Sequence, residues 1–419
     1  MKVTSGSPPA SKYSSAMRIS SIIYFLISVG VALQISGSNW DIVWHGIGNV
    51  ETFFTPPHSV IYSGVVLVIG SVVVGIIHTT KISQQKNIPS KRNIFGLLTV
   101  SLPLPIKLAI IGCTLQLTAG PFDFWWHNQF GFDGLLSPPH SVLATGMLMA
   151  ALGALIGIYY HYRGQNNNST SCSIFSGLSL ILAFAVFLLV GVGMVLMFTL
   201  PFSKGQYFDF NPNPVAAVVA ASTFIPFIIG LCLFVAVKIS AFSTNNKRIP
   251  FMLTSIIAVI MIIQSTTTIT SNSYFAWLFP LYLLNILPAI VADILIYSYL
   301  QKKKSEISIT SSLSSSSYSA QSFSLNSKVT NPNNNTTTIK LCLIASMIVS
   351  IFYATLFFPW TIDVYGGYFK PPNTLRTEEF FVQLLIPVIL PIAVPVSVLS
   401  SMTGGLIGQK LMNIRKSIA

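Results

Sequence analysis

The sequence predicts an all-α polytopic integral membrane protein of about ten transmembrane helices, with a tandem parallel helical-hairpin repeat in its N-terminal part. Of its 419 residues, 52% are hydrophobic and 8% are charged, and the mean hydropathy is +0.70. A soluble domain carries about 25% charged residues. The apolar residues gather in stretches of about 20, the length that crosses a bilayer as a helix. The predicted spans are residues 19–40, 58–79, 95–119, 140–160, 174–200, 214–237, 250–270, 275–300, 340–360 and 380–403.

The basic residues predict how these spans are oriented. The chain has 23 Lys and Arg against 10 Asp and Glu, a net charge of +13. On the predicted topology, most Lys and Arg fall on one side of the membrane and most Asp and Glu on the other. By the positive-inside rule both termini are then cytoplasmic. The basic excess is therefore a topology signal, so the lipid bilayer is the expected partner and a nucleic acid is not.

Composition divides the chain into five parts. Residues 1–17 are polar and are predicted to be a disordered cytoplasmic N-terminus, and residues 18–163 are predicted to form a module of four helices. Residues 164–300 hold the fifth to eighth spans. Residues 301–338 are rich in Ser, Thr and Asn and are predicted to be a cytoplasmic linker, because they cannot bury enough apolar area to fold. Residues 339–419 hold the last two spans and a tail.

One pattern of metal-ligating residue types occurs twice in the four-helix module. Asp41-x3-His45-x12-His58 is followed 82 positions later by Asp123-x3-His127-x12-His140. The windows around them, 40–64 and 122–146, share nine of 25 residues. Asp and His are costly inside a membrane and are found there mainly at functional sites. The repeat therefore predicts two metal sites at the outer side of the membrane.

The spacing explains how each window can hold an ion. In a helix, residues four apart lie on one face, which brings the Asp beside the first His. The second His follows Thr55 or Ser137 and two prolines, a sequence that predicts a capped helix start with this His in the first turn. Two imidazoles and a carboxylate suit copper, zinc or non-haem iron better than calcium or magnesium. Glu51 and Asp133 are either acceptors for a ligand imidazole N–H or solvated loop acids.

Other interpretations of these polar residues stay open. An Asp–His pair at a membrane surface also forms simple hydrogen-bonded patches, and a duplication alone preserves both copies. The chain is alternatively a transporter of metal or small solutes, a metal-delivery protein, or a non-catalytic structural partner of a membrane complex. Lys107 and Asp293 are a candidate intramembrane pair. Lys107 is expected near the middle of the third span, at a helix broken by Pro103 and Pro105.

The Asp-x3-His-x12-His motif resembles the metal motif of the C-type subunit of the copper membrane monooxygenases, the particulate methane and ammonia monooxygenases. The resemblance covers residues 18–163. Asp41, His45 and His58 match the first site of that family. His127 and His140 match the two histidines of its second site. There the spacing is one residue shorter than usual, and Asp123 stands where Asn is common.

The resemblance implies a copper-dependent membrane monooxygenase subunit, with iron or zinc as alternative metals. It also implies other membrane subunits as partners, and dioxygen and a small apolar molecule as substrates. Whether this chain is itself the enzyme stays open, as does the choice between one dinuclear site and two mononuclear sites.

Overall fold

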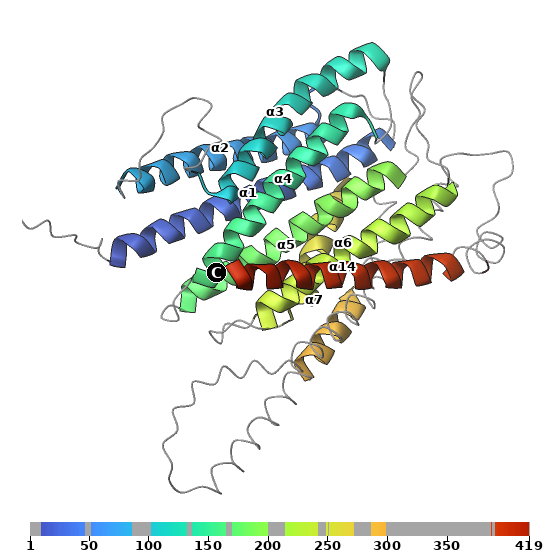
Figure 1. Ribbon diagram of the computed structural model, residues 1–419. Coiled ribbons are helices and arrows are strands. Elements are labelled where there is room, and N and C mark those ends of the chain that lie inside the picture. The colour runs from blue at the N-terminus through green and yellow to red at the C-terminus, as the bar shows by residue number, and fades with distance from the viewer. Residues whose placement is uncertain are drawn as a thin grey trace, which may run out of the picture.

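The computed structural model of the chain is a bundle of α-helices (Figure 1). It describes residues 10–46, 52–85, 102–131, 136–164, 170–199, 214–241, 251–271, 286–298 and 390–418, together with residues 249 and 387, and this part of the chain contains no β-strand. The labelled helices are α1 (Ala10–Gly46), α2 (Pro56–Gln85), α3 (Leu104–Phe130), α4 (Pro138–Gly164), α5 (Thr170–Thr199), α6 (Pro214–Ala241), α7 (Met252–Ser271) and α14 (Leu390–Ile418).

Within the described residues, seven helices are long and apolar enough to cross a membrane: α1 to α6 and α14. Two shorter apolar helical segments, Met252–Gln264 of α7 and Ile286–Ser298, lie within the seventh and eighth predicted spans. The span predicted at 340–360 and the linker predicted at 301–338 lie outside the described residues. The chain is therefore an all-helical membrane-type protein, and the total of ten spans stays a prediction.

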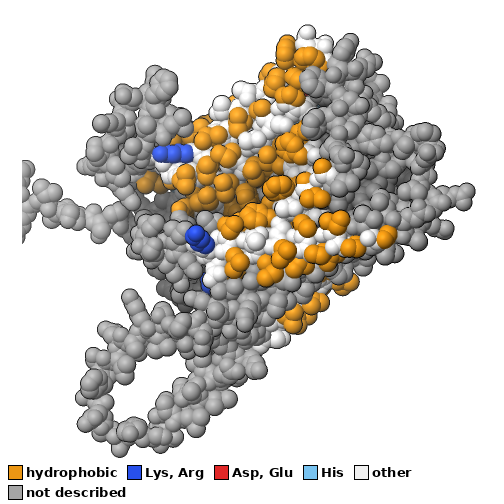
Figure 2. Space-filling model, turned by 45° about the vertical axis from the view of Figure 1, so that its right-hand side comes forward, with side chains coloured by type: hydrophobic (Ala, Val, Ile, Leu, Met, Phe, Trp, Pro, Cys, Tyr) orange, Lys and Arg blue, Asp and Glu red, His pale blue; other side chains and the backbone are white. Residues whose placement is uncertain are grey.

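The outer surface of the bundle is apolar, as a surface in contact with lipid must be. Val66 is 67% exposed, Leu178 59% and Ile262 63%, although each lies on a helix with a buried opposite face. Figure 2 shows hydrophobic side chains covering much of one face, while the few Lys and Arg side chains visible there lie toward one end. Exposed apolar patches of this extent are rare on soluble monomers, so the bilayer accounts for them.

The first four helices form two hairpins. α1 packs against α2 and α3 against α4, and glycines let each pair approach closely. A Cβ on Gly30 would lie 2.8 Å from the Gly64 carbonyl oxygen, and one on Gly112 would lie 2.6 Å from that of Gly146. Small residues at such crossings are typical of membrane helix pairs. The turns of both hairpins lie at one end of the bundle, here called the motif end, where Phe53 and Phe124 are 6.0 Å apart between ring centroids.

The remaining helices extend the bundle away from this pair of hairpins. α5 packs against α4 and α6, and α14 crosses α6 (Figure 1). Ser397 Oγ donates a hydrogen bond to the Ser222 carbonyl at 3.2 Å. A Cβ on Gly408 would lie 3.2 Å from the Leu231 carbonyl oxygen. Small and hydroxylated residues therefore hold the C-terminal helix against the bundle.

The bounds of α1 and α3 differ from those of the spans predicted from the sequence. α1 begins at Ala10, so residues 10–17, which were expected to be disordered, are helical. Extending an existing helix costs much less free energy than starting a new one, which explains why α1 includes these additional residues. α3 runs from Leu104 to Phe130 instead of 95–119.

The start of α3 corrects the expected position of Lys107. Pro103 is the N-cap in an extended conformation, and a proline stands at N1 or N2. Proline fits the first helical turn, where its missing N–H would have no partner in any case. Pro103 and Pro105 therefore start the helix instead of breaking it. Lys107 lies in the first turn of α3 and not near the middle of a span.

Candidate metal centre

Helix α3 carries the first two residues of the second window, and it stays helical past them. Pro121 lies inside α3, two residues before Asp123, yet the helix continues to Phe130. Asp123 and His127 are therefore one turn apart on a single face. His127 Nε2 lies 3.4 Å from Asp123 Oδ1. This confirms the condition on which the predicted spacing depended.

Helix α4 brings the third residue to the same point. Ser137 is the N-cap, because its hydroxyl accepts a hydrogen bond from the His140 backbone N–H at 3.3 Å. This bond to the third helical residue is the usual cap interaction. Pro138 is the first residue of α4. His140 Nε2 lies 3.3 Å from Asp123 Oδ1, so the predicted arrangement of cap, proline and first-turn histidine is confirmed.

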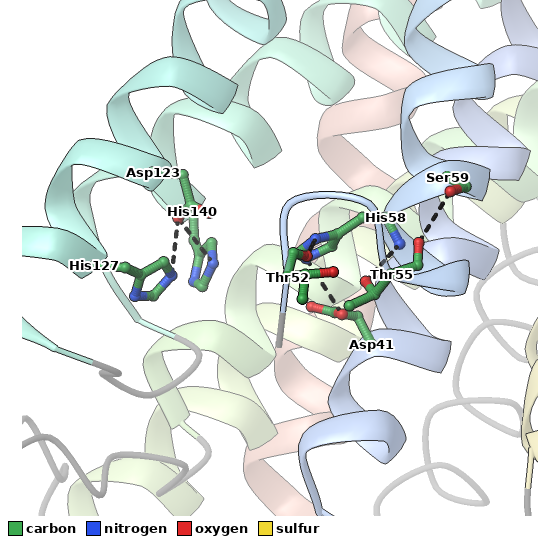
Figure 3. Close-up of polar contacts among 8 residues, drawn as sticks. All are labelled: Asp41, Thr52, Thr55, His58, Ser59, Asp123, His127 and His140. Carbon is green, nitrogen blue, oxygen red and sulfur yellow. Dashed lines mark hydrogen bonds and ion pairs between the residues drawn. The ribbon is translucent and has the colours of Figure 1, made fainter. Parts of the chain in front are cut away.

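Asp123, His127 and His140 together form a group that can hold a metal ion (Figure 3). Each side chain is half-buried, and one ligand atom from each lies within 4.8 Å of the others. An ion with bonds of about 2.0–2.1 Å to tetrahedral ligands separates those ligands by about 3.3–3.4 Å. The two distances from Asp123 Oδ1, 3.3 Å and 3.4 Å, have this length. Two of the three separations between the ligand atoms thus match a tetrahedral metal site, and all three are within 4.8 Å.

A backbone carbonyl fixes the ring of His127. Gly131 ends α3 with φ 72° and ψ −170°, and its N–H donates to the His127 carbonyl at 3.0 Å. Its own carbonyl oxygen lies 3.2 Å from His127 Nδ1. With Nδ1–H donating to this carbonyl, Nε2 carries the lone pair and faces Asp123. Metal-binding histidines are commonly oriented in this way.

In the first window the structure brings together two of the three predicted ligands. His58 Nε2 lies 3.4 Å from Asp41 Oδ1. Thr55 caps α2 by accepting a hydrogen bond from the His58 N–H at 3.4 Å, and His58 Nδ1 lies 3.2 Å from the Thr52 carbonyl oxygen. His45 belongs to α1, but its side chain lies outside the described part of the structure.

The two windows lie side by side at the motif end (Figure 3). Phe53 of the first contacts Phe124 of the second, with 6.0 Å between ring centroids. His58 lies 5.9 Å from the Tyr62 ring, and the buried Trp126 packs on Phe130 at 4.4 Å. An aromatic contact therefore joins the two copies beside the Asp–His groups.

A backbone carbonyl oxygen lies beside the Nδ1 atom of two of the histidines. These are the carbonyl oxygens of Thr52 and Gly131. Glu51 and Asp133 lie outside the described residues, so their expected role as acceptors stays a prediction. Every residue has a backbone carbonyl, so the residue type alone does not predict which carbonyl lies beside a histidine. Only Gly131 could have been noticed in the sequence, because a glycine directly after an apolar helix is a common C-cap.

The structure does not bring Lys107 and Asp293 together. Asp293 is buried on helix Ile286–Ser298, and its carboxylate accepts hydrogen bonds from α7. The donors are the N–H of Leu253 at 3.3 Å and both the N–H and the hydroxyl of Thr254 at 2.8 Å. These are first-turn N–H groups, which have no partner within their own helix. Asp293 therefore caps α7 from a neighbouring helix.

No protein-family model, curated protein or solved structure matches this chain significantly.

Proposed function

We propose that this protein is a membrane-embedded metalloprotein in which Asp123, His127 and His140 hold a transition-metal ion, copper in the first instance. One observation carries the proposal. Three ligand atoms from two helices converge within 4.8 Å of one another, and a capped helix start and a helix-ending glycine fix two of the side chains.

The ligand set argues for a transition metal. Two imidazole nitrogens and one carboxylate oxygen suit copper, iron or zinc, whereas calcium and magnesium prefer oxygen ligands alone. Copper is preferred among these because the Asp-x3-His-x12-His motif resembles the copper motif of the membrane monooxygenases. A bound copper ion would supply one-electron chemistry with dioxygen.

The chain's own residues would prepare this site in three ways. The Asp123 carboxylate offsets the charge of a cation in an apolar environment, where an unpaired charge is costly. The backbone carbonyl of Gly131 holds one imidazole so that Nε2 faces the ion. Ser137 caps α4 and so holds His140 in the first helical turn. The apolar helices give small apolar molecules and dioxygen a path from the bilayer, as a component of a membrane monooxygenase needs.

Elemental analysis of the purified protein tests this function. We expect stoichiometric copper in the wild type and the loss of at least the copper bound at this window in His127→Ala and Asp123→Ala. The matched control is His161→Ala, because His161 also lies on α4 but packs on Tyr24 with 5.7 Å between the rings. That variant should keep its copper. A wild-type protein without stoichiometric transition metal would overturn the proposal.

The same experiment with His58→Ala separates one shared centre from two independent ones. If the windows bind separately, His58→Ala and His127→Ala each remove a different part of the metal. If they form a dinuclear centre, either substitution removes all of it. Copper-dependent oxidation of a small alkane or ammonia by the protein, alone or with partner subunits, tests the monooxygenase role.

A further inference from the structure

The repeat extends deeper into the bundle than the metal motif. Gly30-x3-Gln34-x6-Asp41 on α1 has the same spacing as Gly112-x3-Gln116-x6-Asp123 on α3. Gln34 and Gln116 are thus equivalent positions of the two copies, 82 residues apart, as the predicted metal ligands are. The repeat therefore extends beyond the windows that contain the histidines.

Both glutamines are buried, and neither has a hydrogen-bond partner among the described residues. Gln34 is fully inaccessible and Gln116 is 3% exposed. In each, the amide nitrogen and the amide oxygen form no hydrogen bond with this part of the chain. Burying an amide without a partner costs free energy, and most buried polar side chains are therefore satisfied. The same cost recurs at the same position of both copies, which indicates that a bound molecule satisfies the amides.

The partner helices leave room for these side chains. A Cβ on Gly64 would lie 2.8 Å from Gln34 Cγ, and one on Gly146 would lie 2.9 Å from Gln116 Cγ. Each glutamine therefore lies across from a glycine of its own hairpin, and any larger residue there would meet it. The glycine is needed where the glutamine packs, and this arrangement is present in both hairpins.

The glutamines lie beneath the Asp–His groups. Gln34 precedes Asp41 by seven positions, and Gln116 precedes Asp123 by seven positions. In a helix, seven residues turn by about 700° and rise about 10.5 Å, so each glutamine shares a helix face with its aspartate. The amides are therefore about two turns farther into the membrane than the metal ligands, on the same face.

The surroundings favour a neutral molecule. Residues 19–40, 59–77, 108–122 and 141–160 contain no Asp, Glu, Lys, Arg or His, so an ion at this depth would meet no opposite charge on the four helices of the hairpins. A carboxamide offers two donors and one acceptor. The molecule that fits is small and neutral, and it both donates and accepts hydrogen bonds. Water has these properties and commonly satisfies buried polar groups.

We propose that Gln34 and Gln116 are two equivalent binding sites for internal water, one beneath each Asp-His-His window. They give the bundle a hydrated layer between its apolar core and the motif end. The proposal does not depend on a bound metal, so it can be tested separately from the proposed function.

Solid-state NMR that transfers polarisation from water protons to side-chain nitrogen tests this proposal. The sample is the full chain, labelled with ¹⁵N in its glutamine side chains, stripped of metal with a chelator and placed in bilayers of deuterated lipid. We expect the two buried amides to gain signal from water about as fast as the exposed Gln129. Signals that grow only as slowly as those of the apolar core would overturn the proposal.

Two variants assign the signals. Gln34→Met and Gln116→Met keep the length of the side chain and remove its amide, and each should delete one of the two buried signals. If only one variant folds, the remaining buried signal is assigned by difference. Copper content measured on the same variants should match the wild type, because neither glutamine is a ligand. A loss of copper there would place the glutamines in the metal site and contradict the separate water sites.

Discussion

Replacing Gly131 by alanine tests how the metal centre is held. Gly131 has φ 72° and ψ −170°, a conformation that residues with a Cβ rarely adopt. Forcing alanine into it costs about 1–3 kcal/mol. No atom of the other described residues lies within 4 Å of the added Cβ, so the expected cost comes from the backbone conformation. The chain relieves this strain by moving the residue, and the contact between its carbonyl oxygen and His127 Nδ1 is then lost.

The loss of this contact sets the expected effect on metal affinity. Removing the hydrogen-bond partner of a ligand imidazole lowers affinity by about 10- to 100-fold. This corresponds to about 1.4–2.7 kcal/mol, because each factor of ten is about 1.4 kcal/mol. This loss of binding free energy is no larger than the backbone strain of about 1–3 kcal/mol. Relief of the strain at residue 131 is therefore large enough to release the His127 ring.

Competition with a chromophoric copper chelator, on protein in detergent, measures the affinity. Gly120→Ala is the matched control, because Gly120 also lies on α3 and its added Cβ meets no described residue within 4 Å, but its φ is not positive. It should bind copper as the wild type does. If folded Gly131→Ala binds copper within a factor of two of the wild type, the carbonyl of Gly131 does not support the site and the reasoning is wrong.

Three further substitutions test other contacts. Ser137→Ala removes the cap of α4, so it should lower stability by about 1 kcal/mol and weaken copper binding. Ser137→Asp keeps a hydrogen-bond acceptor and should retain both properties. Thermal unfolding measures the stability, and chelator competition measures the copper affinity. Asp293→Ala leaves buried N–H groups of α7 without an acceptor and should lower stability by about 1–3 kcal/mol. Asp293→Asn, which keeps one oxygen, should lose less. Gly404→Ala places a Cβ against the Phe227 carbonyl oxygen and should reduce the yield of folded protein in gel filtration, unlike Gly193→Ala.

Each of these expectations has an outcome that contradicts it. Equal copper affinity in Ser137→Ala and the wild type would show that the cap does not position His140. Equal unfolding of Asp293→Ala and the wild type would exclude a capping role for that carboxylate. A normal yield of Gly404→Ala would mean that α6 and α14 separate at little cost.

Much of the candidate site could be predicted because its geometry is local. The four-residue spacing of Asp123 and His127 fixes one helix face, and the Ser-Pro-Pro-His sequence specifies a helix start with His140 in its first turn. Both features depend only on residues that are close together in the sequence, so the sequence pattern predicts them. The boundary of α3 was less predictable, because hydropathy falls near its polar end while the backbone stays helical through Pro121.

Contacts between distant residues were beyond local patterns. Asp293 was a candidate partner of Lys107 because both are ionisable residues in apolar segments. Only packing shows that its carboxylate lies at the start of α7, 39 residues away from Thr254 in sequence. The carbonyl acceptors of Thr52 and Gly131 were not predicted either, since their role depends on where the loop returns and not on residue type.

The sequence by itself determined the class of the protein and the identity of the candidate ligands. Both follow from composition and from spacing within single helices, where apolar length and the helical period leave few alternatives. Only the tertiary structure decided that the two histidines and the aspartate of the second window meet at 3.3 Å and 3.4 Å. It alone decided that two buried glutamines lie unpaired beneath the windows. These facts depend on how closely the glycine-lined helices approach one another, and a linear pattern does not contain that distance.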